Sequence, residues 1–253
     1  MSRSVHGEDA VGVVDSPRAK PAIVDTFVSS WMSLAGGAER GGDWCEVVNV
    51  SDDVLALTVG DVAGHGESVG HIMASLRDAT LAAISRDDVP STVLEAANRE
   101  AARFFAGDGV IVTAIVAFLN HRLRTLTFAN AGHPPPLMMT ADRAAFLQQR
   151  PADLPLGVYP YHHSANYVVA VPLDAVVLFY TDGITEHARD PIAGEIELAE
   201  ATRYIYQRPE VDLARAVGTR VLRRARGDDD AAILAVRMIP AAGKRSAGPD
   251  LSP

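Results

Sequence analysis

Four aspartates of this 253-residue chain stand beside glycine or a second aspartate at the edge of an apolar segment. They are Asp43 in RGGDW, Asp61 in LTVGDVAGHG, Asp182 in LFYTDGITE and Asp229 in RGDDDAAILAV. Their oxygens are ligands that hard divalent ions such as Mg²⁺ and Mn²⁺ prefer, and four negative charges balance two such ions. One aspartate next to glycine is also ordinary turn chemistry. The prediction of a metal centre therefore rests on the four residues together.

Strand order gives a reason for these side chains to meet. Asp61 and Asp182 follow segments that read as strands, whereas Asp43 and Asp229 precede such segments. In antiparallel hairpins the end of one strand lies beside the start of the next. We therefore expect the four carboxylates to converge at one end of the sheets. Glycines beside them would let backbone carbonyls and waters approach an ion.

The apolar pattern predicts strands in hairpins and helices in pairs. The expected hairpins are 45–50 with 54–61, 110–119 with 123–131, and 166–173 with 175–183 around Asp174, followed by a last strand at 231–239. The expected helices are 67–85, 91–105 with Ser91 as N-cap, 194–207 and 210–225. This order favours helices covering antiparallel sheets over a doubly wound parallel sheet.

Composition narrows the class of protein. Asp and Glu outnumber Lys and Arg by 32 to 23, and this acidic balance argues against nucleic acid as a partner. The single cysteine, Cys45, allows no internal disulfide. No signal-peptide core is evident, and the longest apolar run, 110–119, is half of the roughly 20 residues that span a membrane. We expect a cytoplasmic protein that does not enter a membrane.

One domain accounts for most of the chain. Residues 1–21 and 240–253 have the mixed or Pro-, Gly- and Ser-rich composition of flexible segments. No repeat or internal linker divides the rest, so residues 22–239 are predicted to form one domain.

Six segments in this order, GGDW, GDVAGHG, NAGHPPP, LPLG, YTDGITE and DDAAILAVR, carry a resemblance over about residues 36–238. The chain resembles the SpoIIE-type branch of the metal-dependent protein phosphatases, bacterial relatives of the PPM serine/threonine phosphatases. The resemblance implies an α+β fold, an α-β-β-α sandwich of two antiparallel sheets flanked by helix pairs.

The resemblance also implies a catalytic metal centre made by Asp43, Asp61, Asp182 and Asp229. In it Asp61 bridges two Mn²⁺ or Mg²⁺ ions, the backbone carbonyl of Val62 joins one of them, Asp182 and Asp229 hold the other, and Asp43 acts through water. Two such ions acidify a shared water and neutralise a phosphoryl group, so no covalent enzyme intermediate is needed. The implied substrate is phosphoserine or phosphothreonine on a protein, commonly a STAS-domain anti-anti-sigma factor in partner-switching control of transcription.

Two other functions remain open in the sequence. GESVG fits the nucleophile elbow of serine hydrolases with Ser68 as nucleophile, although an elbow needs a strand running directly into its first glycine. A phosphatase fold kept as a binding or regulatory module without turnover is the second alternative.

Two histidines lie within the segments that carry the resemblance. His65 and His133 lack zinc-ligand spacing, and we expect them to stabilise loops by hydrogen bonds.

Ser68, Val69 and Gly70 stand where the family usually has alanines, and a glycine near a helix start lowers the stability of the helix by up to about 1 kcal/mol relative to alanine. A looser helix suggests an activating protein partner. No sensor module fits before residue 22, so regulation is expected from a partner, from homodimer formation or from expression level.

Overall fold

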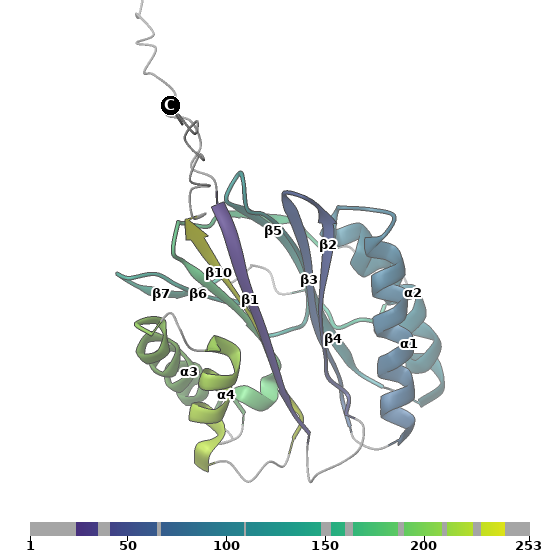
Figure 1. The fold of residues 1–253 in the computed structure, drawn as a ribbon. Helices are drawn as coiled ribbons and strands as arrows, with labels where there is room; N and C mark the ends of the chain where they lie inside the picture. The colour runs from purple at the N-terminus through teal and green to yellow at the C-terminus, as the bar shows by residue number, and fades with distance from the viewer. Residues whose placement is uncertain are drawn as a thin grey trace, which may run out of the picture.

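Two antiparallel sheets lie face to face, and a helix pair covers the outer face of each (Figure 1). The computed structural model describes residues 24–34, 41–64, 67–108, 110–147, 153–159, 164–186, 190–208, 212–224 and 229–240. The predicted flexible segments therefore lie outside the described residues, except Pro240, which ends the last strand. Among the described helices, none has the length and hydropathy needed to cross a membrane.

The first sheet contains both hairpins predicted from the first half of the chain. Its strand order is β2-β3-β4-β5-β8. The strands are β2 (Trp44–Ser51), β3 (Val54–Val62), β4 (Val112–Asn120), β5 (Thr125–Ala131) and β8 (Tyr167–Ala170). Trp44 pairs with Gly60, so the start of β2 lies beside the end of β3.

The second sheet has the order β1-β10-β9-β6-β7. Its strands are β1 (Val24–Ser33), β6 (Leu137–Met139), β7 (Ala144–Phe146), β9 (Val176–Tyr180) and β10 (Ala231–Pro240). The sequence did not predict β1, β6 or β7. Ser, Thr and Asp interrupt the apolar pattern of β1, while β6 and β7 have three residues each.

The hairpin predicted around Asp174 is wrong, because β8 and β9 belong to different sheets. The Val171 N–H donates to Arg124 O at 2.8 Å in the first sheet, whereas the Asp174 N–H donates to Met238 O at 2.8 Å in the second. Asp174 has a positive φ of 63°, and its carboxylate pairs with Arg237 of β10 at 2.7 Å. The turn therefore carries the chain from one sheet to the other.

All four predicted helices form. They are α1 (Glu67–Ile84), α2 (Pro90–Asp108), α3 (Pro191–Tyr206) and α4 (Leu213–Val221). Short 3-10 turns lie at η2 (Asp182–Ile184) and η3 (Leu222–Arg224). Ser91 is not the N-cap of α2, because the helix already includes Pro90, a residue suited to a first helical position. The Ser91 N–H instead donates to Asn166 Oδ1 at 2.9 Å.

Three apolar layers hold the sandwich together. The first, around Leu76 and Leu94, lies between the α1/α2 pair and its sheet. The second, around Leu57 and Phe179, lies between the sheets. The third, around Leu198 and other residues of α3 and α4, lies against the other sheet. The predicted α-β-β-α sandwich is thus confirmed.

Candidate metal centre

Hydrogen bonds tie the two sheets together at the end of the sandwich where the aspartates lie. Thr181, directly after β9, donates its hydroxyl to Asp43 Oδ2 at 2.8 Å. The same hydroxyl oxygen accepts the Ala232 N–H of β10 at 2.8 Å. The Gly42 N–H donates to Asp230 Oδ2 at 2.7 Å. Residues before β2 are therefore fixed to the end of β9 and the start of β10.

Asp43 lies deepest in the cluster, with 2% of its surface exposed. Burial and the negative charges of Asp61 and Asp230 together raise the pKa of its carboxyl to about 9, against the lowering effect of the hydrogen bond from Thr181. This carboxyl group thus holds a proton at neutral pH unless a cation takes the proton's place.

Burial and neighbouring negative charges also raise the pKa values of Asp61 and Asp182. Burial, followed by the charge of Asp182 and then those of Asp229 and Asp230, raises the pKa of Asp61 to about 7. Burial also raises the pKa of Asp182, with further contributions from Asp229 and Glu186. The structure therefore brings the four predicted aspartates together, as the strand order indicates.

The donor set suits divalent cations that keep part of their water shell. No Lys, Arg or His of the described residues is among the groups that shift the pKa values of Asp43, Asp61 and Asp182. No three His, Cys, Asp or Glu side chains in the described ranges are arranged to hold an ion by themselves. Mg²⁺ is commonly bound by only one or two carboxylates plus waters, so the oxygen-rich cluster fits it.

Gly42 leaves the backbone oxygen of Val62 uncovered. A Cβ at position 42 would collide with the backbone oxygen of Val62, whose N–H donates to Gly42 O at 3.1 Å. A side chain there would cover or displace this carbonyl, which is the backbone ligand that the resemblance implies. The lack of a Cβ at Gly42 thus fits a metal role for Val62.

Gly60 has a different use from the one expected. A Cβ at this position would overlap the indole ring of Trp44, its cross-strand partner. The glycine thus makes room for Trp44, whose Nε1 donates to Thr58 Oγ1 at 3.3 Å. The expectation that it clears space for an ion is wrong.

Asp230 is the site residue that the sequence prediction missed. It is buried, and its side chain holds Gly42, whereas Asp229 is exposed and accepts the Asp230 N–H at 2.9 Å. Three consecutive aspartates offered no basis for assigning different roles. The available signal was position, since Asp230 directly precedes the buried strand β10.

His133 stabilises its loop, as expected. Its backbone N–H donates to Asn130 Oδ1 at 2.7 Å, and the Asn130 amide donates to His133 O at 2.8 Å. The ring Nδ1 lies 2.8 Å from Thr113 Oγ1, and Thr113 pairs with Asp61 across β3 and β4. Burial lowers the pKa of His133 to about 3, which keeps the ring neutral. His65 lies outside the described residues.

Ser68 does not occupy a nucleophile elbow. It is exposed and is the second residue of α1, six positions beyond the end of β3 at Val62. An elbow serine would stand on a turn that leads directly from a strand into a helix. The serine hydrolase alternative therefore loses its structural basis.

Solved structures share this architecture. The RsbU and RsbW domains of Rv1364c from Mycobacterium tuberculosis match with a TM-score of 0.76 and 29% identity over 87% of this chain and 62% of theirs. The PP2C phosphatase domain and regulatory fragment of SpoIIE from Bacillus subtilis match with a TM-score of 0.74 and 14% identity, over 87% and 64%. This chain thus spans less than two thirds of either one.

A third structure, RsbX in complex with magnesium, matches with a TM-score of 0.61 and 15% identity over 85% of this chain and 95% of its own. The family model described as Stage II sporulation protein E (SpoIIE) matches residues 51–239. That range runs from the end of β2 to β10 and includes Asp61, Asp182 and Asp229. The chain therefore belongs to the family described as Stage II sporulation protein E (SpoIIE).

Proposed function

We propose that this chain is a Mn²⁺- or Mg²⁺-dependent phosphatase that removes phosphate from phosphoserine or phosphothreonine on a protein. The observation that carries the proposal is the cluster of aspartates whose pKa values are raised by burial and by one another. Such a cluster is poorly stable without positive charge, and two divalent ions would supply it. The magnesium complex of the related RsbX supports this choice of ion.

Each proposed ligand has its own place at the two ions. Asp61 responds to Asp43 and Asp182 as well as to Asp229, which suits a bridging ligand between two ions. The Val62 carbonyl would join one ion, and Asp182 with Asp229 would hold the other. Asp43, fixed by Thr181, would orient water at the same centre. When bound, two divalent ions supply an acidified water and neutralise the phosphoryl group during in-line displacement.

A covalent route through cysteine is disfavoured. Cys45, the single cysteine, directly follows the first residue of β2. Burial and the negative charges of Asp43 and Glu46 raise the pKa of its thiol well above its ordinary value. A thiol held protonated is a weak nucleophile, so direct attack by water is the better route.

The proposed substrate is a STAS-domain regulator of the anti-anti-sigma type, handled in the cytoplasm. Among the similar structures, one pairs an RsbU domain with an RsbW domain, and another belongs to a study of the bacterial stressosome. Both relatives support a role in partner switching. The alternative is a weak or silent module that binds such a protein without turnover.

Phosphate release from a phosphorylated STAS protein tests the proposal. Wild type should release phosphate with Mn²⁺ or Mg²⁺ and stop when EDTA is added. Asp61→Asn should remove most of this activity, whereas Asp78→Asn, a change at an exposed residue of α1, should leave it intact. Binding of the phosphoprotein with no release under any metal would support the silent module instead.

A further inference from the structure

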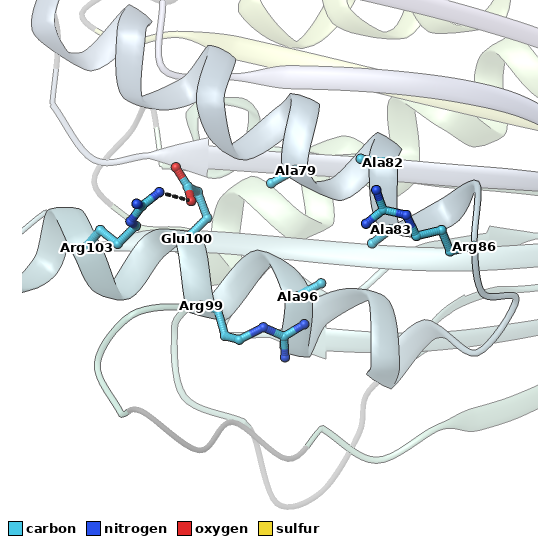
Figure 2. A pocket seen from close by; sticks show the side chains of 8 residues that line it. All are labelled: Ala79, Ala82, Ala83, Arg86, Ala96, Arg99, Glu100 and Arg103. Atoms are coloured by element: carbon cyan, nitrogen blue, oxygen red, sulfur yellow. Dashed lines mark hydrogen bonds and ion pairs between the residues drawn. The ribbon is translucent and has the colours of Figure 1, made fainter.

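A groove runs between α1 and α2 on the outer face of the molecule (Figure 2). It has a volume of about 390 Å³ and is lined by Ala79, Ala82, Ala83, Arg86, Ala96, Arg99, Glu100 and Arg103. Helix α1 supplies Ala79, Ala82 and Ala83, the turn after it supplies Arg86, and α2 supplies the other four residues at positions i, i+3, i+4 and i+7, which share one helix face. The groove is therefore formed by facing residues of the two helices.

Small side chains line the groove and long charged ones border it. The alanines leave methyl groups along its length, which let another backbone approach closely. Arg103 at one end donates to Glu100 Oε2 at 2.9 Å, and Glu100 also accepts from Ser75 Oγ at 2.8 Å. These bonds fix one end of the groove.

Two further arginines, Arg86 and Arg99, border the groove. Arg86 from the turn after α1 and Arg99 from α2 are both exposed, and Figure 2 shows them on opposite sides of the groove, with Ala83 and Ala96 between. Within the described ranges, neither guanidinium has an ion-pair partner. Unpaired arginines are notable in a chain whose formal net charge is −9.

None of the residues that line the groove is a proposed catalytic residue. Ala79 lies twelve residues beyond Glu67, the first residue of α1, and Arg86 lies just past the end of that helix. At 1.5 Å per residue, the nearest lining residue of α1 is about 18 Å from the helix start. A ligand in the groove would therefore bind through residues other than the proposed catalytic ones.

The shape and charge together select the kind of ligand. A small anion would meet only exposed arginines, since the alanines offer no side-chain donors. An amphipathic helix can place apolar residues against the alanines and carboxylates against the arginines, and guanidinium groups bind carboxylates in a bidentate manner. We propose that the groove docks an acidic amphipathic helix of a partner protein, with its carboxylates on Arg86 and Arg99.

A defined peptide probe tests this proposal without any turnover, so its outcome is independent of the proposed phosphatase activity. The probe is a fluorescein-labelled helix of about four turns, with Ala and Leu on one face and Glu on both flanks. Its companion carries Lys in place of Glu. Fluorescence anisotropy is measured with wild type, Arg86→Glu/Arg99→Glu and Ala82→Trp, which fills the groove. Arg203→Glu/Arg223→Glu, at exposed positions of α3 and η3, is the matched control.

The proposal predicts that wild type and the control bind the Glu peptide, and that both groove variants bind it about tenfold more weakly or worse. The Lys peptide should prefer the charge-reversed variant over wild type. Circular dichroism checks that each variant is folded. Equal binding by wild type and the groove variants, no binding by wild type, or displacement by millimolar inorganic phosphate would overturn the proposal, the last by indicating a small-anion site.

Discussion

Thr181 Oγ1 donates a hydrogen bond to Asp43 Oδ2 across 2.8 Å and so joins the end of β9 to the residue that precedes β2. The two residues are 138 positions apart and adjoin strands of different sheets. The same hydroxyl accepts the Ala232 N–H, which links β10 to the pair. The positions of the clustered carboxylates thus depend on one threonine that is not itself a proposed ligand.

Removing that hydroxyl should weaken the joint between the sheets. Thr181→Val leaves a buried Asp43 oxygen and the Ala232 N–H without this partner, so we expect the free energy of unfolding to fall by about 1–3 kcal/mol. Urea denaturation in EDTA measures this loss. Thr181→Ser keeps the hydroxyl and serves as the control. Equal stability of Thr181→Val and wild type would show that the bond contributes nothing.

The stability of the metal-free protein should fall as pH rises. Asp43 and Asp61 have pKa values of about 9 and about 7 in the folded protein, against 3.8 without the fold. Between about pH 4 and pH 9 the folded state therefore binds more protons than the unfolded chain, and stability declines until these groups ionise. Urea titrations in EDTA across this range test the slope.

Asp43→Asn provides the comparison for that slope. This variant lacks the carboxyl group whose pKa is raised to about 9, so its free energy of unfolding should decline less with rising pH than that of wild type. Added Mn²⁺ should stabilise wild type more at higher pH, because the ion competes with protons for the same oxygens. A wild-type slope identical to that of Asp43→Asn would contradict the raised pKa.

Gly42 and Gly60 should differ in what their replacement impairs. Gly42→Ala would place a methyl group against Val62 O and should weaken Mn²⁺ binding about 10-fold or more. Gly60→Ala would press on Trp44 and should lower stability by about 1–3 kcal/mol, with little change in the Mn²⁺ affinity of the folded fraction. Calorimetric titration and urea denaturation separate the two. The prediction for Gly42 fails if its variant binds Mn²⁺ like wild type.

His133 should lower the stability of the folded protein only at acidic pH. Because burial lowers its pKa to about 3 from 6.5, the unfolded chain takes up a proton that the folded protein does not, as pH falls from about 6.5 toward 3. His133→Gln removes this term, so the stability difference between variant and wild type should shift in the variant's favour over that range. A constant difference would mean that the ring is not held neutral.

The sequence contained enough information to predict the layers and the meeting of the aspartates. The β2–β3 hairpin and the separate strands β9 and β10 follow from apolar runs, although the pairing of β9 with β10 does not, and the carboxylates lie beside the ends of these strands. The helix pairs follow from three- and four-residue spacing of apolar side chains. These features are local, so local patterns predict them.

The parts that the sequence did not predict depend on tertiary contacts. Whether the turn at Asp174 closes a hairpin or crosses between sheets is decided by its bonds to Met238 and Arg237, which lie more than sixty residues away. The roles of Asp229 and Asp230 likewise separate only when Gly42 approaches one of them. Strand β1 is recognisable once β10 lies beside it along its full length.

In the proposed function, the aspartate cluster holds the ions needed for hydrolysis. The most direct test measures Mn²⁺ binding by calorimetry and phosphate release on the same preparations of wild type, Asp182→Asn and Asp174→Asn. We predict two ions per chain and turnover for wild type and Asp174→Asn, with Asp182→Asn losing ion binding and turnover together. Unchanged Mn²⁺ binding in Asp182→Asn, or turnover in wild type stripped of metal, would contradict the account.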